Sequence, residues 1–371
     1  MTAESLVAEI FGDQEALLTA LEADGWPRKL AAAGFLRHRE TWVVRDLEEA
    51  LDRELGALEA GELVWPDRVC HVWPALPGAG VTPVLFGVLL GIEQVVRISR
   101  RGAGFGEYFQ RCARRAGVGV EVELPQEEAG RGSMPTAEVY VVSGSDQTVE
   151  AVRGQVSGTV VGYGHRVSFG VVVDDGEVDL GAVAGEMAAD GVLWNQRGCF
   201  SLRGVLFDGE PPRRRRFAEE LAGAIDRREE EWGAAAGLSE GEIAQRAQAL
   251  GKAQMAGEVF CQGVGFVVID DGPFRGRQVA AHSVSVHGVA GPQGVREALA
   301  LPARHVQGVA LAGAWSRDQL GWIEALGRAG ATRVCGAGEL QAPEAGWWHD
   351  GRPNVLSWAR AVSLSSVIGG A

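Results

Sequence analysis

From residue 65 onward, segments typical of short strands alternate with segments typical of helices, and this alternation constrains the fold more than any other feature of the chain. The first apolar run, Val69 to Trp73, is followed by a turn rich in Pro and Gly and then by VTPVLFGVLLGI, which predicts a buried helix. The next segment, EQVVRIS, predicts a short strand. A strand, a helix and a second strand in this order form the βαβ unit of a parallel sheet. We therefore expect an α/β protein with largely parallel sheets.

The alternation continues to the end of the chain. AEVYVVSGSDQTVEAVRG predicts a strand that passes through Gly-Ser into a helix, with Ser145 or Asp146 as its cap. Further strands are predicted in GTVVGYGHRVSFGVVVDD, LRGVLFDG, HVQGVALAG and ATRVCGAG, separated by helices that include DLGAVAGEMAADGVLWNQ, RRRRFAEELAGAIDRREEEWGA and SRDQLGWIEALGRAG. The stretch 232–275 is ambiguous, with a helical part followed by the strand-like GVGFVVIDDG.

Residues 1–60 have a different character. SLVAEIF and QEALLTALEADGW repeat their apolar residues every three to four positions, and DLEEALDRELGALEAG is amphipathic, so this segment is predicted to be helical. A chain of 371 residues exceeds the length of roughly 250–300 residues over which a single core keeps growing. We therefore expect two domains.

The composition argues against several classes of protein. A net charge of −14 disfavours nucleic acid and anionic membranes as main partners. The N-terminus carries charges through its apolar positions, unlike a signal peptide, and Pro, Glu and Arg interrupt the longest apolar stretch, VTPVLFGVLLGIEQVVRIS. The five cysteines show no CxxC spacing, so neither a disulfide framework nor a structural zinc site is expected. We expect a cytoplasmic protein without a membrane span.

Three other motifs have ordinary interpretations. RRRR at 213–216 precedes an acidic helix and is interpreted as a solvated face, with a basic patch for nucleic acid or a carrier protein as the weaker alternative. His282 and His287 flank SVSV and are expected on opposite faces of a strand, so no metal site is predicted. WWHDG, residues 347–351, is interpreted as a structural cluster of aromatic and polar residues.

Two segments have both an ordinary and a functional interpretation. VSGSDQTVEAVRG, residues 142–154, is either a plain βα turn or a helix N-terminus that holds a phosphate with its backbone amides. WNQRGCFS, residues 194–201, holds Cys199 between a glycine and an aromatic residue. A buried, inert thiol is the ordinary interpretation. A tight turn that presents the sulfur beside a backbone amide would instead make Cys199 a nucleophile with an oxyanion donor at hand.

The segment around Cys199 resembles the active-site segment of the aldehyde dehydrogenase superfamily. In that superfamily the pattern F-x-N-x-G-Q-x-C is followed by a strand and a helix. Here GVLWNQRGCFS is followed by the predicted strand VLFDG and the predicted helix FAEELAGAI. Three other segments resemble one branch of this superfamily more closely, namely the long-chain acyl-CoA reductases of the bioluminescence type (LuxC-like). These segments are VYVVSGSDQTVEAVR, GYGHRVSF and GATRVCGAGELQAPEAGWWHDGRPNVLSWAR. The resemblance extends over residues 65–371 and is weakest at 232–300.

The resemblance implies an aldehyde dehydrogenase-like fold, with a helical segment at 1–60, an NADP-binding domain at 61–165 and an α/β catalytic domain carrying Cys199 at 166–371. It implies that NADPH reduces a long-chain acyl thioester to an aldehyde through a Cys199 acyl-enzyme. Acyl-CoA or an acyl-carrier protein would deliver the acyl group, an acyl-transfer protein is a candidate partner, and a homo-oligomer is expected.

The resemblance also assigns roles to single residues. Cys199 falls on the nucleophile, and Ser143, Gly144 and Ser145 fall on the turn that faces the cofactor phosphates. VVRIS matches a family strand ending in Lys-x-Ser, so Arg97 and Ser99 are expected to bind the cofactor, and an arginine there favours a 2′-phosphate and thus NADP. Members that hydrolyse their acyl-enzyme carry a glutamate at the position of Gly162, so no water is expected to be activated here.

One position departs from the family. The turn after the first strand usually reads His-x-x-x-Gly-Asn-x-Pro, with the Asn as an oxyanion donor, but here it reads HVWPALPGAG and places Leu76 near that Asn. Loss of one such donor costs about 10²–10³ in rate. We therefore expect reduced activity or another donor such as Asn195. Two rivals stay open: a catalytically impaired paralogue that acts as a binding or assembly subunit, and a reductase of acyl phosphates.

Overall fold

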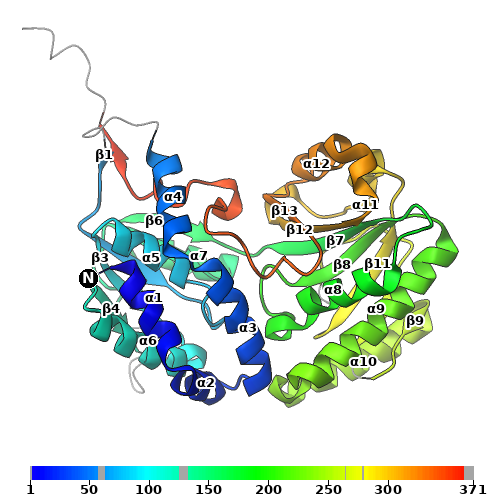
Figure 1. The fold of residues 1–371 in the computed structure, drawn as a ribbon, viewed down its shortest axis with the longest axis horizontal. Helices are drawn as coiled ribbons and strands as arrows, with labels where there is room; N and C mark the ends of the chain where they lie inside the picture. Colours follow the sequence, from blue (N-terminus) through cyan, green and yellow to red (C-terminus); the bar gives the residue numbers. More distant parts are fainter. Residues whose placement is uncertain (1, 57–62, 125–132, 264, 278–279, 363–371) are drawn as a thin grey trace, which may run out of the picture. The chain divides into compact units, whose positions relative to one another are not determined.

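The computed structural model describes residues 2–56, 63–124, 133–263, 265–277 and 280–362 (Figure 1). The chain divides into two compact units, which we describe one at a time. Unit 1 comprises residues 1–25, 38–165 and 344–371, and unit 2 comprises residues 26–37 and 166–343. The predicted roles of 61–165 in cofactor binding and of 166–371 in catalysis stay predictions.

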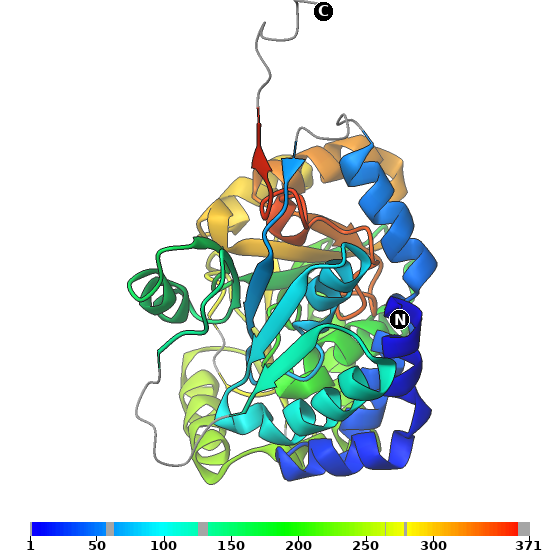
Figure 2. The ribbon, with the colours of Figure 1, turned by 90° about the vertical axis from the view of Figure 1, so that its left-hand side faces the viewer.

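Unit 1 is built on a five-stranded parallel sheet with the strand order β4-β3-β2-β5-β6. Helices α5, α6 and α7 connect successive strands, and the N-terminal helices α1 and α2 pack against α6, as Figure 2 shows in dark blue and cyan. A short antiparallel pair joins β1 to β14. The strands are β1 (Leu63–Val64), β2 (Arg68–Val72), β3 (Glu93–Arg97), β4 (Val120–Glu123), β5 (Val139–Ser143), β6 (Thr159–Tyr163) and β14 (Arg360–Ala361). The helices are α1 (Ala3–Gly12), α2 (Gln14–Ala23), α4 (Val44–Leu55), α5 (Val81–Leu89), α6 (Ala103–Ala116) and α7 (Asp146–Arg153).

The order of these strands fixes where a ligand would bind in unit 1. β2 lies in the middle, and the chain proceeds to β3 and β4 on one side and to β5 and β6 on the other. Ligands of open α/β sheets bind at the carboxyl ends of the strands, where the strand order reverses. In unit 1 that place is the end of β2 and β5. Apolar side chains such as Cys70, Val95 and Val142 fill the core beneath it.

Unit 2 is built on a seven-stranded sheet with the order β13-β12-β7-β8-β11-β10-β9, parallel except for the antiparallel pair of β9 and β10. Helices α8, α9 and α10 cover one face, and α11 and α12 cover the other (Figure 1). The strands are β7 (Val167–Val173), β8 (Leu202–Asp208), β9 (Val259–Phe260), β10 (Phe266–Ile269), β11 (Ser283–Gly288), β12 (Val306–Gly313) and β13 (Arg333–Cys335). The helices are α8 (Leu180–Val192), α9 (Pro211–Trp232), α10 (Glu240–Ala256), α11 (Val295–Ala298) and α12 (Gln319–Arg328), and α3 (Arg28–Thr41) is shared between the two units.

The core of unit 2 explains why its strands are almost continuously apolar. Both faces of the sheet are covered, and the core contains large, fully buried side chains such as Phe169, Leu206, Phe274 and Trp322. The α/β class with largely parallel sheets, predicted from the sequence, is thereby confirmed. In the described residues, we find no helix with the length and apolar character needed to cross a membrane.

Candidate active site

The predicted nucleophile follows an irregular segment between α8 and β8. α8 ends at Val192, and Trp194, Asn195 and Gln196 then adopt left-handed backbone conformations with φ angles of 55°, 53° and 57°. A left-handed conformation costs a non-glycine residue roughly 1–2 kcal/mol. Three such residues in a row persist only where the surrounding structure holds them, and strain of this kind gathers at functional sites.

Two buried side chains hold this segment in place. Nε2 of Gln196 donates to the carbonyl of Leu202, at the start of β8, at 2.6 Å, and to the carbonyl of Ser283, at the start of β11, at 3.0 Å. The ring of Trp194 packs edge-on against Trp26, with centroids 5.2 Å apart. The segment before Cys199 is therefore anchored to two strands and to an aromatic cluster.

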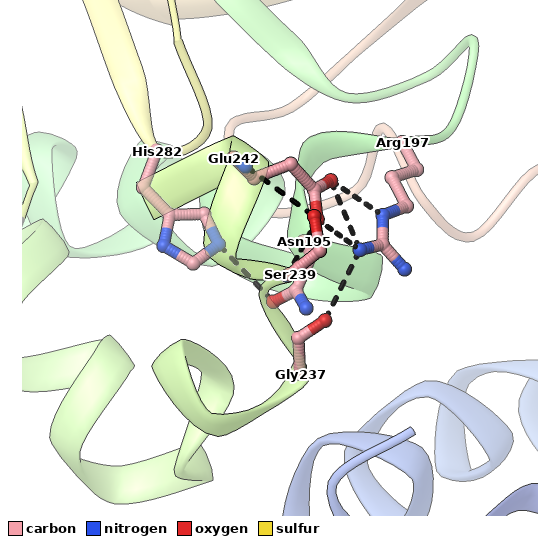
Figure 3. A network of polar contacts seen from close by, with 6 residues as sticks. All are labelled: Asn195, Arg197, Gly237, Ser239, Glu242 and His282. Atoms are coloured by element: carbon pink, nitrogen blue, oxygen red, sulfur yellow. Dashed lines mark hydrogen bonds and ion pairs between the residues drawn. The ribbon is translucent and has the colours of Figure 1, made fainter. Parts of the chain in front are cut away.

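Asn195 belongs to a buried polar network (Figure 3). Its Oδ1 lies 3.2 Å from Nε2 of His282, and Nδ1 of that ring contacts the carboxylate of Glu229. Arg246 donates to the same carboxylate at 3.0 Å. Nδ2 of Asn195 is buried and has no hydrogen-bond partner in the described part of the chain. Asn195 thus has one amide donor that makes no hydrogen bond within the described residues. Its role as a donor to an oxyanion stays a prediction.

Arg197, two residues before Cys199, has its charge balanced locally. Its guanidinium donates to the carboxylate of Glu242 at 2.9 and 3.0 Å and to the carbonyl of Gly237 at 3.1 Å (Figure 3). Ser239 caps α10 and donates to the same carboxylate at 2.7 Å. These contacts engage Arg197 with a carboxylate rather than with the turn that follows it.

Cys199 lies in a turn that hydrogen bonds close on several sides. The amide of Gly198 donates to Oγ of Ser201 at 3.1 Å, and the amide of Ser201 donates to the carbonyl of Gly198 at 3.2 Å. Ser168, on β7, donates its hydroxyl to the carbonyl of Cys199 at 2.9 Å and accepts from the amide of Gly308 at 3.1 Å. Cys199 forms no disulfide with the other described cysteines, and its side chain is partly exposed. The turn is therefore fixed while Cys199 stays accessible.

Three of the other cysteines are poorly suited to nucleophilic chemistry. Burial raises the pKa of Cys70 to about 12. Burial also raises the pKa of Cys112 and that of Cys261. A cysteine reacts as its thiolate, so these three side chains are held in the unreactive form at neutral pH.

Arg203, for which no role was predicted, lies four residues after Cys199 and near the start of β8. Burial lowers the pKa of its guanidinium, and the charge of Cys199 acts in the opposite direction. Ser168 was missed as well. A signal was present for Arg203, because it is the one charged residue in the apolar run LRGVLF, but no signal in the sequence marks Ser168 as a partner of residue 199.

The predicted phosphate turn lies at the carboxyl end of β5. Ser143 ends that strand, and the amide of Gly144 donates to the carbonyl of Tyr163 at 3.1 Å. Oγ of Ser145 caps α7 by accepting from the amide of Thr148 at 3.1 Å, so Ser145 is the cap of the two that the sequence left open. The turn therefore presents the N-terminus of α7 at the edge of the sheet where a ligand is expected.

Arg97 and Ser99 lie on the other side of β2. Arg97 ends β3, and its Nη1 donates to the carbonyl of Ser133 at 3.0 Å. Ser99 precedes the short helical turn Arg100–Gly102. The structure thus places all five predicted cofactor residues in unit 1, at the ends of β3 and β5, and it places Cys199 and Asn195 in unit 2.

Two positions bear on the departures from the family pattern. Leu76 is half-buried in the turn between β2 and α5, and its side chain has no donor to offer an oxyanion. Gly162 lies in β6, where an added Cβ would lie 2.4 Å from Cγ1 of Val149. A larger side chain would therefore require Val149 to move.

A family match and a likeness to solved structures place the chain among known proteins. The family described as acyl-CoA reductase (LuxC) matches residues 118–361, which is more than half of the chain. Among solved structures, the fold resembles aldehyde dehydrogenase 21 from Physcomitrella patens in complex with the product succinate, with 13% identity, a TM-score of 0.69 and coverage of 98% of this chain and 84% of that one. No curated protein matches the sequence.

A second solved structure is glyceraldehyde-3-phosphate dehydrogenase GapN from Methanocaldococcus jannaschii complexed with NADP, with 12% identity, a TM-score of 0.60 and coverage of 90% of this chain and 79% of that one. A third is an NAD-dependent benzaldehyde dehydrogenase from Corynebacterium glutamicum, with 15% identity, a TM-score of 0.62 and coverage of 92% and 83%. At these identities the likeness concerns the fold, which is that of the aldehyde dehydrogenases. With the family match, it shows that the chain is an oxidoreductase and belongs to the LuxC family of acyl-CoA reductases.

Proposed function

We propose that this chain reduces an acyl thioester to an aldehyde with NADPH, through a covalent intermediate on Cys199. The observation that carries this proposal is the turn at 198–201, which an internal hydrogen bond closes and Ser168 of β7 holds, while Cys199 stays partly exposed. A reactive cysteine needs such a combination of fixed backbone and access. The membership in a family of acyl-CoA reductases supports the same reaction.

The proposed reaction begins with Cys199 as a thiolate. Its sulfur bonds to the carbonyl carbon of the thioester, the bond from that carbon to the sulfur of CoA or a carrier breaks, and the released thiolate takes up a proton. The acyl group then rests on Cys199 as a new thioester. A bound NADPH would supply a hydride to the acyl carbon. The resulting alkoxide re-forms a carbonyl and expels the Cys199 thiolate, which frees the aldehyde.

The residues of unit 1 fit a dinucleotide. Gly144 lets the backbone run close to the first turn of α7, because an added Cβ there would lie 3.2 Å from Cβ of Thr148. Helix N-termini favour phosphates. The carboxylate of Asp146, in the first turn of α7, accepts a hydrogen bond from the amide of His165 at 2.7 Å. Arg97 would bind the 2′-phosphate that distinguishes NADP from NAD. Solved structures of the same fold contain NAD and NADP.

Two features support reduction over hydrolysis and set the expected rate. Gly162 places no carboxylate in β6 and leaves no room for one without movement of Val149, so no base is supplied there to activate water. Leu76 has no hydrogen-bond donor for an oxyanion. The proposed replacement is Nδ2 of Asn195, which has no hydrogen-bond partner in the described residues. We therefore propose an acyl reductase that is slower than members with the usual Asn.

The same proposal covers the length of the acyl chain, the acyl donor, the protein partners and the location in the cell. The acyl chain is long, CoA or an acyl-carrier protein delivers it, and an acyl-transfer protein and a second copy of the chain are the proposed partners. The proposed location is the cytoplasm, in keeping with described cysteines that form no disulfide with one another.

The decisive experiment traps the intermediate. The purified protein is mixed with a long-chain acyl-CoA, and peptides are examined by mass spectrometry for an acyl adduct on Cys199. NADPH is then added and aldehyde is measured. We expect the adduct and the aldehyde with the native chain and with Cys261→Ser, a matched control at an exposed cysteine. Cys199→Ala is expected to give neither product.

The rival functions predict other results. A chain that has lost catalysis and serves as an assembly subunit would form no adduct, and aldehyde formation would be absent or independent of Cys199. A reductase of acyl phosphates would yield aldehyde from an acyl phosphate and leave acyl-CoA unreacted. Either result would overturn the proposed function.

A further inference from the structure

The buried network around Asn195 reaches from the segment before Cys199 to two helices of unit 2. His282 precedes β11, and its ring lies between the amide oxygen of Asn195, at 3.2 Å, and the carboxylate of Glu229 on α9 (Figure 3 draws the contact with Asn195). Arg246 on α10 donates to the same carboxylate at 3.0 Å. All four side chains are at most 5% exposed. The network therefore ties the segment before Cys199 to α9, α10 and the start of β11.

The partners of His282 decide where the protons of its ring lie. Oδ1 of Asn195 is an acceptor, so Nε2 of His282 donates to it. The carboxylate of Glu229 already accepts from Arg246 and offers the ring another acceptor, so Nδ1 of His282 donates as well. A ring that is committed on both sides fixes the direction of the Asn195 amide.

Both ends of the hydrogen bond between His282 and Asn195 have a left-handed backbone. The φ angle is 55° at His282 and 53° at Asn195. Such a conformation is unfavourable for a non-glycine residue and persists where surrounding contacts hold it. The neighbouring residues are joined too, since Nε2 of Gln196 donates to the carbonyl of Ser283 at 3.0 Å. Two successive residues at the start of β11 thus hold two successive residues of the segment that leads to Cys199.

Stability alone does not account for charged side chains in this place. Buried ion pairs can often be replaced by apolar side chains of similar volume without loss of stability. In addition, Oε2 of Glu229 is buried and has no hydrogen-bond partner in the described part of the chain, which adds to the cost of burying this carboxylate. Local departures of this kind are expected at functional sites.

From these contacts we propose that Glu229 and His282 are positioning residues for the nucleophile. They hold Asn195 in its left-handed conformation, which sets the direction in which the chain enters the Cys199 turn. The inference rests on the proposed function, in which Cys199 attacks the thioester. Neither positioning residue touches the substrate. They keep the sulfur where the acyl carbon is presented, and a displacement of about 1 Å at such a site lowers a rate about 10²-fold.

The first measurement follows the segment without substrate or cofactor. Hydrogen–deuterium exchange of the whole chain is read by mass spectrometry in the peptide that covers residues 193–201. In His282→Ala we expect its amides to exchange about tenfold faster, because the buried hydrogen bond that holds Asn195 is lost. Asn195→Asp keeps the oxygen that accepts from the ring, and it is expected to exchange like the native chain.

The second measurement distinguishes a positioning role from a loss of stability. The rate at which a long-chain acyl-CoA acylates Cys199 is followed by mass spectrometry at several acyl-CoA concentrations. In His282→Ala we expect the maximal rate to fall about tenfold and the half-saturating concentration to stay within about twofold. The double variant with His282→Ala and Asn195→Ala is expected to be no slower than Asn195→Ala alone, because the ring acts through that amide.

The matched control is His287→Ala. This histidine of β11 is also buried, but its ring contacts the carbonyl of Gly272 at 2.7 Å and Oγ of Ser285 at 2.8 Å. We expect native exchange in residues 193–201 and a native rate of acylation. Circular dichroism checks that every variant is folded. Glu229→Gln, which keeps the size of the side chain and weakens its contact with the ring, is measured in parallel and is expected to act in the same direction as His282→Ala.

The two proposals fail in different ways. Faster exchange in His282→Ala, in a chain whose native form is not acylated, would support the hold on Asn195 and overturn the reductase function. Acylation of the native chain at a rate that folded His282→Ala and Glu229→Gln both retain would support the function and overturn the positioning role. Equal effects of His287→Ala and His282→Ala on exchange and acylation would overturn the positioning role as well.

Discussion

At the scale of single residues, the sequence predicts functional roles for Cys199 and Arg97, whereas it gives no sign of Ser168. Cys199 was predicted because Gly198 and the aromatic Phe200 give its segment a recognisable pattern. Ser168 has no motif of its own, because its hydrogen bond to the carbonyl of Cys199 at 2.9 Å depends on where β7 lies in the sheet. Arg97 lies where it was predicted, at the end of β3, although its Nη1 also donates to Ser133 at 3.0 Å.

The proposed role of Arg97 gives a prediction about cofactor choice. Arg97→Ala is expected to weaken NADPH binding about tenfold or more and to leave NADH binding nearly unchanged, because a charged hydrogen bond to a phosphate contributes about 1.5–3 kcal/mol. Titration calorimetry with both cofactors measures this. Arg101→Ala is the matched control at a neighbouring exposed arginine. Equal effects on both cofactors would show that Arg97 does not bind the 2′-phosphate.

At the scale of elements, the strands and helices follow the local pattern, but the segment before Cys199 does not. The periodicity predicts α8 as a helix through Gln196, whereas α8 ends at Val192 and the next residues are left-handed. The reason is that Gln196 donates to two strand carbonyls, which no local pattern reveals. The register shift between β7 and β8, at Ser168–Gly170, was unpredictable for the same reason, because it depends on how the two strands pair.

The turn that leads to Cys199 is expected to depend on the amide of Gln196. Gln196→Glu keeps the shape but removes both donated hydrogen bonds, at 2.6 and 3.0 Å, and places a carboxylate against two buried carbonyls. We expect the free energy of unfolding to fall by about 2–4 kcal/mol. Urea unfolding measures it, with Gln293→Glu as a control at an exposed site. A change below about 0.5 kcal/mol would show that another contact holds the left-handed residues.

At the scale of the whole molecule, buried ionisable groups determine how stability depends on pH. Burial raises the pKa of Asp190, on α8, to about 7. Its Oδ2 accepts from the amide of Gly338 at 2.8 Å, whereas its Oδ1 has no partner among the described residues. Burial lowers the pKa of both His38 and His71 to about 4. These two histidines therefore contribute stability that is lost as the pH falls from about 6.5 to about 4.

Asp190 is expected to have the opposite effect on stability. Its pKa is higher in the folded chain than in the unfolded one, so its contribution is present below about pH 4 and is lost as the pH rises to about 7. Asp190→Asn is expected to remove this loss, of the order of a few kcal/mol, while the contributions of His38 and His71 remain. Unfolding at several pH values measures the difference, and Asp52→Asn is an exposed control. Parallel profiles for Asp190→Asn and the native chain would contradict the expectation.

The sequence by itself determined the α/β class, limited the cap of α7 to Ser145 or Asp146, and marked Cys199 as the candidate nucleophile. These features depend on near neighbours in the chain, namely apolar spacing, turn residues and a short motif. The tertiary structure alone decided that residues 26–37 join the unit that contains Cys199, that Ser168 holds the Cys199 turn and that Gln196 anchors the segment before it to two strands. Those features depend on strand register and burial, which bring together residues far apart in the chain, and one sequence read locally carries no record of them.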